Sequence, residues 1–159
     1  MCELLDTMVR EPMIVTNEDF KVIDSAIEDV RKSGTKIRKT FASYNESEGY
    51  DIAWEVSAAV EAFSSFSSRW SIEILSTLYI AGDRRFNEMR KLLTGISSRT
   101  LSDKLTHCAE LGLVNRIVDE GPPIRVRYQL TEHGRNAGRL LSPLVAYMKI
   151  QKGRVVKEK

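Results

Sequence analysis

Hydrophobic residues recur every three or four positions in several stretches of this chain, a spacing typical of amphipathic helices. The apolar positions of the first stretch are Phe20, Ile23, Ile27 and Val30. Before it, Thr16 and Asp19 have the spacing of an acidic capping box, which predicts the start of a helix. We expect this helix to end near Gly34, and we interpret the polar residues 36–49 as a connection.

Two more helices are predicted in the next part of the chain. The apolar positions of the first extend from Ile52 to Phe63, and the serine-rich residues 64–68 are suited to end it. Those of the second extend from Trp70 to Leu78, and Gly82 marks its end because glycine is common after the last turn of a helix.

A pair of short helices follows. Apolar residues between Phe86 and Leu93 indicate a short helix closed by Gly95, and Ser97 and Ser98 are natural N-cap residues for the next one. The apolar face of this next helix consists of Leu101, Leu105 and Cys108. Two short helices joined by a tight turn that contains glycine form a helix-turn-helix unit.

The residues after this pair alternate between apolar and polar positions, as strands do. Residues 113–118 and 126–130 are predicted strands, and the turn between them contains Pro122 and Pro123. A last helix begins at Thr131 and Glu132 and has an apolar stripe from Leu140 to Met148. This order predicts a mainly α fold with a small β-hairpin, which is a winged helix-turn-helix with extra N- and C-terminal helices.

The charges of the chain are unevenly distributed. Residues 1–68 hold 7 Lys and Arg against 13 Asp and Glu, a net charge of −6. Residues 69–159 hold 17 Lys and Arg against 9 Asp and Glu, a net charge of +8. A basic half favours a polyanionic partner, although charge that serves solubility alone is an open alternative at this point.

The chemistry that would support several other classes is absent from the sequence. His107 and His133 belong to unrelated elements, and no Walker loop, dinucleotide-binding glycine motif or nucleophile elbow occurs. Cys2 and Cys108 have no metal-ligand spacing. We therefore expect no enzyme activity, no cofactor and no metal. The acidic N-terminus and the lack of a long apolar run favour a cytoplasmic protein without a membrane partner.

The second helix of the pair has the pattern of a DNA-recognition helix. With Leu101 and Leu105 facing inward, helical geometry turns the polar residues on the other face outward, where a major groove can accept them. Asp103 is unusual in a groove, and it could accept from cytosine or orient Arg99 four residues earlier. The expected DNA-contacting residues of this helix are Ser97, Ser98, Arg99, Thr100, Ser102, Asp103, Lys104 and Thr106.

Further basic residues suit the DNA backbone. Arg125 and Arg127 lie two apart on a predicted strand of the hairpin, and hence on one face, where they could contact phosphate or the minor groove. The alternative is that they are protective charges on an edge strand. Candidate phosphate contacts around the first helix of the pair are Arg84, Arg85, Arg90 and Lys91.

Several of these segments together resemble the HxlR-type regulators, which are MarR-like winged-helix proteins. The resemblance extends in order from Arg69 to Met148. It rests on Arg69-Trp70, Arg85-Phe86-Asn87-Glu88-Met89, Gly95-Ile96-Ser97-Ser98-Arg99-Thr100-Leu101, Leu111-Gly112-Leu113-Val114, Pro122-Pro123, Arg125-Val126, Tyr128-Gln129-Leu130-Thr131 and Gly134.

The resemblance implies a transcription regulator that binds double-stranded DNA operators as a homodimer. It also implies dimer contacts through the helices around Ile52–Phe63 and Leu140–Met148. We expect an N-terminal extension of unassigned role over residues 1–50, the DNA-binding domain over residues 51–150 and a basic tail over residues 151–159. No motif in the sequence identifies the operator or a small-molecule effector.

This sequence departs from the family at one position with chemical consequences. Many members carry a cysteine before the first core helix, and the spacing from Trp70 places Ser57 there, which excludes thiol sensing at that position. The rival function is a winged helix that binds only proteins, because a fold does not settle a function. That reading predicts a wing without basic residues, whereas this wing carries Arg125 and Arg127.

Overall fold

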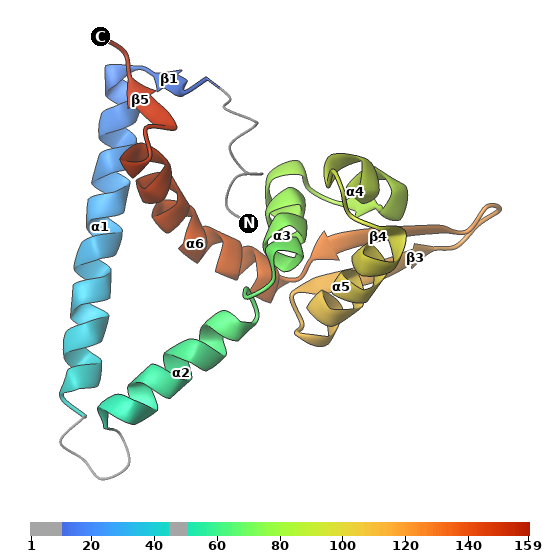
Figure 1. The fold of residues 1–159 in the computed structure, drawn as a ribbon, viewed down its shortest axis with the longest axis horizontal. Helices are drawn as coiled ribbons and strands as arrows, with labels where there is room; N and C mark the ends of the chain where they lie inside the picture. The colour runs from blue at the N-terminus through green and yellow to red at the C-terminus, as the bar shows by residue number, and fades with distance from the viewer. Residues whose placement is uncertain (1–10, 45–50) are drawn as a thin grey trace. The chain divides into compact units, whose positions relative to one another are not determined.

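The structure, a computed structural model, describes residues 11–44 and 51–159 (Figure 1). Cys2, the acidic N-terminus and the polar run 45–49 therefore lie outside the described residues. Contacts divide the described chain into two compact units. The first consists of residues 11–43 and 140–159, and the second consists of the described part of residues 44–139. No helix in the described ranges has the length and apolarity to span a bilayer.

The first unit is built on one long helix. Strand β1 (Met13–Val15) leads into helix α1 (Asn17–Ala42), and the unit also holds the last part of helix α6 (Glu132–Gln151) and strand β5 (Val155–Lys157). Strands β1 and β5 pair in parallel beside the start of α1 (Figure 1). Neither strand was predicted, because a three-residue strand whose partner lies some 140 residues away leaves no local pattern.

Helix α1 begins as predicted and ends later than predicted. The Thr16 hydroxyl accepts a hydrogen bond from the Asp19 backbone N–H at 3.1 Å, which confirms the cap. The expected end near Gly34, with a connection from residue 36, is wrong because the helix continues to Ala42. A glycine inside a helix costs only about 1 kcal/mol relative to alanine, and the apolar spacing continues through Ile37 and Phe41.

The second unit contains the predicted helices and the predicted hairpin. Its elements are α2 (Ile52–Ser64), α3 (Arg69–Ala81), β2 (Arg84–Arg85), α4 (Phe86–Leu92), α5 (Ser98–Glu110), β3 (Val114–Asp119), β4 (Arg125–Leu130) and the first part of α6. The hairpin β3–β4 is antiparallel, with Val114 opposite Leu130 and Asp119 opposite Arg125. The short strand β2 adds a third, antiparallel partner to β4, giving the order β2-β4-β3. The prediction of a mainly α winged helix-turn-helix is confirmed.

One hydrophobic cluster holds the second unit together. It is formed by α3, α4, α5 and the hairpin, and its fully buried members include Ile74, Met89, Leu101, Leu105 and Cys108. Burial of such side chains contributes on the order of 1.5–3 kcal/mol each. The cluster fixes α5 against the domain by one face and leaves its other face for contacts outside.

The first turn of α6 is fixed to the hairpin by a close backbone approach. The Thr131 hydroxyl donates to the Gly112 carbonyl at 2.6 Å and accepts from the Gly134 backbone N–H at 2.9 Å. A Cβ atom on Gly134 would overlap the carbonyl oxygen of Leu113. Only glycine therefore fits at this position without a shift of the backbone.

Candidate nucleic-acid interface

The two faces of α5 differ as the sequence predicted. Ser97 is the N-cap residue, and its hydroxyl accepts from the Thr100 backbone N–H at 3.0 Å. The inward side chains Leu101, Leu105 and Cys108 are no more than 1% exposed. The exposed residues on the rest of this helix include Ser98, Arg99, Ser102, Asp103 and Thr106. A rigid helix thus presents a short polar surface whose orientation is fixed by the core.

Arg99 is the most prominent cation of that surface. Its side chain is 93% exposed, and its Nε atom lies 4.0 Å from Oδ2 of Asp103. The orienting role expected for Asp103 is compatible with this distance, and an exposed pair of this kind is weak enough to open for a ligand. Thr100 and Lys104 are half-buried and lie at the flanks of the outward face.

The basic residues around α4 have different surroundings. The Arg90 guanidinium donates to the Ser98 hydroxyl at 2.8 Å and so connects α4 to the start of α5. The Arg85 backbone N–H donates to the Glu88 carboxylate at 2.8 Å, which caps α4 and leaves the side chain exposed. Arg84 donates to the backbone carbonyl of Asp83 at 2.7 Å. Lys91 is exposed on α4.

The two wing arginines share a face but not an environment. Arg125 is exposed at the first position of β4. Arg127 is half-buried and lies between two carboxylates, at 2.5 Å from Asp83 and 3.3 Å from Asp119. These ion pairs connect the loop before α4 to both strands of the hairpin. Arg125 is therefore available at the surface, whereas Arg127 is held by the protein itself.

Sequence reasoning missed the partner that defines the role of Arg127. Asp83 lies 44 residues before Arg127, so no local spacing indicates the contact. It also missed Arg116, which is exposed on β3 and opposite Tyr128 in the hairpin register. Its signal was a basic residue on a predicted strand of the hairpin.

Cys108 is a core residue rather than a surface thiol. It is 0% exposed, and burial raises the pKa of its thiol, an effect that the neighbouring Ser71 hydroxyl and the charge of Lys104 partly offset. A thiol with a raised pKa is a poor nucleophile because little thiolate is present. Among the described residues, no group of His, Cys, Asp and Glu side chains is placed to hold a metal ion.

A family model described as HxlR-like helix-turn-helix matches residues 65–155, which include the recognition helix and the hairpin. The chain belongs to the HxlR-like helix-turn-helix family. The resemblance found in the sequence is thereby confirmed, and α1 lies outside the matched residues.

Relatives of this HxlR-family chain are named as transcriptional regulators. YtcD of Bacillus subtilis (strain 168), an uncharacterized HTH-type transcriptional regulator, is 30% identical over 102 residues, which cover 64% of this chain and 76% of YtcD. YdeP of the same organism, named likewise, is 40% identical over 70 residues, or 44% of this chain and 52% of YdeP.

Solved structures agree in fold. A MarR-family transcriptional regulator from Enterococcus faecalis V583 has a TM-score of 0.56 and 27% identity, over 67% of this chain and 94% of that one. A crystal structure of the HTH-type regulator YtcD has a TM-score of 0.53 and 29% identity, over 62% and 97% of the two chains. This chain is an HxlR-family helix-turn-helix transcriptional regulator with a winged-helix fold.

Proposed function

We propose that this HxlR-family protein binds double-stranded DNA as a homodimer at a roughly palindromic operator and thereby regulates transcription. The observation that carries the proposal is the two-faced helix α5, whose apolar side is fully buried and whose polar side is exposed. A major groove admits one helix of this kind. We propose the residues expected from the sequence, Ser97 to Thr106 on the outward face, as the base and phosphate contacts.

In this arrangement Arg99 reads a base or contacts a phosphate, and Arg125 contacts the backbone beside the groove. The exposed side chain of Arg99 has the fork geometry that suits two acceptors on guanine. The positive field toward phosphate comes from Arg85 at the N-cap of α4, Lys91 on α4 and Arg125 on the wing. Arg127 and Arg90 act within the protein, because both are engaged by partners of the same chain.

Two helices support the homodimer. Helix α2 has no buried residue in the single chain, and its exposed side chains include Ile52, Val60 and Phe63. The last part of α6 exposes Leu140, which is 78% exposed, and Leu144, which is 51% exposed. Apolar side chains that gather on helices and remain in water mark an interaction surface, and a second copy is the partner that the family resemblance implies.

The dimer predicts the form of the operator. Two recognition helices in successive major grooves lie about 34–36 Å apart, so the half-sites are inverted repeats one helical turn apart. Selection from a random duplex pool, followed by footprinting and sedimentation of the complex, tests this. Two protomers on an inverted repeat support the proposal. One protomer on a single unrepeated half-site would contradict the dimer, and failure to select any sequence would contradict specific binding.

A further inference from the structure

The C-terminal half of α1 has an uncovered apolar face. Val30, Ile37 and Phe41 are spaced by seven and four residues, so they lie on one side of the helix. They are 46%, 54% and 55% exposed, whereas Ile27, one turn earlier, is 8% exposed. Within its own unit, therefore, the chain covers the first half of this stripe and leaves the second half open.

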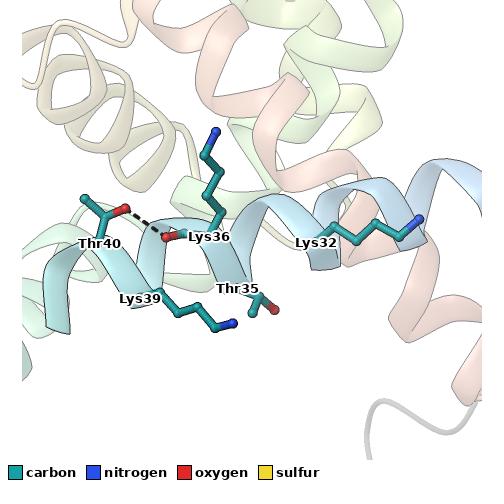
Figure 2. Close-up of a pocket in the computed structure, with 5 residues that line it drawn as sticks. All are labelled: Lys32, Thr35, Lys36, Lys39 and Thr40. Carbon is teal, nitrogen blue, oxygen red and sulfur yellow. Dashed lines mark hydrogen bonds between the residues drawn. The ribbon is translucent and has the colours of Figure 1, made fainter. Parts of the chain in front are cut away.

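The same half of α1 is strongly basic. Residues 31–42 contain five basic residues and no acidic one, namely Arg31, Lys32, Lys36, Arg38 and Lys39. Figure 2 shows Lys32, Lys36 and Lys39 extending from this stretch, with the Thr40 hydroxyl bonded to the Lys36 carbonyl at 3.0 Å. Arg31 and Lys32 pair with Glu28 and Asp29 of the preceding turn. The excess positive charge therefore rests on Lys36, Arg38 and Lys39.

Helix α2 has the complementary character. Residues 51–64 contain three acidic residues and no basic one, namely Asp51, Glu55 and Glu61. The apolar side chains Ile52, Val56, Val60 and Phe63 recur at helical spacing and are 71%, 58%, 67% and 61% exposed. The open apolar stripe of α2, whose charged side chains are all acidic, fits the open apolar stripe in the C-terminal half of α1, where the charged side chains are all basic.

We propose that the C-terminal half of α1 packs against α2 of a second copy of this chain. A second copy is the occupant because each stripe is uncovered within its own unit and the proposed homodimer already places α2 at an interface between copies. A two-fold axis forms the contact twice, since α1 of each copy meets α2 of the other. The two contacts bury seven large apolar side chains from each copy, which suits an interface of about 1,200–2,000 Å². This inference rests on the proposed homodimer and assigns a role to a helix outside the family match.

Cross-linking between two different chains tests the contact. In a Cys2→Ser background, one tagged chain carries Ile37→Cys and an untagged chain carries Val60→Cys. The two chains are mixed, allowed to exchange and treated with a short bismaleimide. Both positions are exposed, so neither change disturbs a core. We expect most cross-linked product to join a tagged chain to an untagged one.

A matched control keeps the experiment specific. Lys32→Cys lies on the side of α1 away from the apolar stripe, and we expect at least fivefold less cross-linking between it and Val60→Cys. Equal yields from Lys32→Cys and Ile37→Cys would overturn the inference, as would cross-links that join only identical chains. A single chain with Ile37→Cys and Val60→Cys that cross-links within itself, while the mixture does not, would show that α2 packs in cis.

Sedimentation and DNA titration of the same samples separate this inference from the proposed function. A dimer that binds DNA but gives no cross-link between α1 and α2 contradicts only the pairing of these helices. A monomer at all concentrations contradicts both the pairing and the homodimer. A cross-linked dimer that binds no duplex supports the pairing and contradicts the proposed DNA binding.

Discussion

Substitution of the two wing arginines by alanine should have opposite effects on DNA binding and on stability. Arg125 is exposed, and in the proposed complex it contacts phosphate. On B-DNA each phosphate contact contributes about 0.9 to the slope of log K against log salt. A homodimer has two wings, so Arg125→Ala should lower the magnitude of the slope by about 1.8. The stability of the protein should not change, because this side chain lies on the surface.

Arg127→Ala should instead leave the slope unchanged and destabilise the fold. Its guanidinium lies 2.5 Å from Asp83 and 3.3 Å from Asp119, and its side chain is 37% exposed. Exposed pairs of this kind contribute about 0–1 kcal/mol each. With solvent screening, the two together give about 1 kcal/mol, or roughly 2–4 °C in Tm for a chain of this size.

The assay is anisotropy of a labelled operator at four salt concentrations, with thermal melts of each variant followed by circular dichroism. Asp83→Asn is the matched control, because it removes one ion-pair partner of Arg127 without touching the wing. It should lower Tm in the same direction as Arg127→Ala. The reasoning would be refuted by a slope that falls for Arg127→Ala and stays constant for Arg125→Ala.

Three further predictions concern the recognition helix, the core and the glycines. Arg99→Ala should weaken operator binding by about 1–3 kcal/mol and relax specificity at one base pair, and an unchanged base preference would contradict the role in readout. Burial raises the pKa of the Cys108 thiol above its ordinary value of about 9.0. The neutral thiol therefore contributes fully to the free energy of unfolding below pH 9.0, and this contribution is lost as pH rises above that value. Because this side chain is fully buried, its reaction with a thiol reagent should require unfolding, and labelling of the native Cys2→Ser protein at pH 8 within minutes would contradict this. Gly134→Ala should destabilise the fold by about 1–3 kcal/mol because its Cβ overlaps a backbone carbonyl, whereas Gly34→Ala, in open space within α1, should stabilise it by about 1 kcal/mol. Denaturant melts with both variants measure the two signs, and a stabilising Gly134→Ala would contradict the packing described for α6.

Local signals explain why the winged core could be predicted from the sequence. The Ser97 cap, the glycine at residue 82 and the alternation in β3 and β4 each act within a few residues. The inward face of α5 followed from helical spacing alone. The rule that a glycine ends a helix was misleading at Gly34. The free-energy cost of one glycine inside a helix is small, and the apolar stripe of α1 continues beyond it.

Contacts between distant residues could not be predicted in this way. The parallel pairing of β1 with β5 joins the two ends of the described chain. The ion pair of Arg127 with Asp83 changed the expectation for that arginine, because the sequence shows its charge and strand position but not the carboxylate that holds it. The residues that contact DNA and the homodimer stay predictions.

The central claim is that the exposed face of α5 binds duplex DNA. The most direct measurement is titration of the full chain and of Arg99→Ala against random and genomic duplexes, by fluorescence anisotropy at two salt concentrations. The account predicts micromolar or tighter binding that weakens steeply with salt and prefers some genomic fragments, and it predicts that Arg99→Ala binds those fragments more weakly. Absence of binding at low salt, or equal binding by the wild type and Arg99→Ala to every duplex, would contradict it.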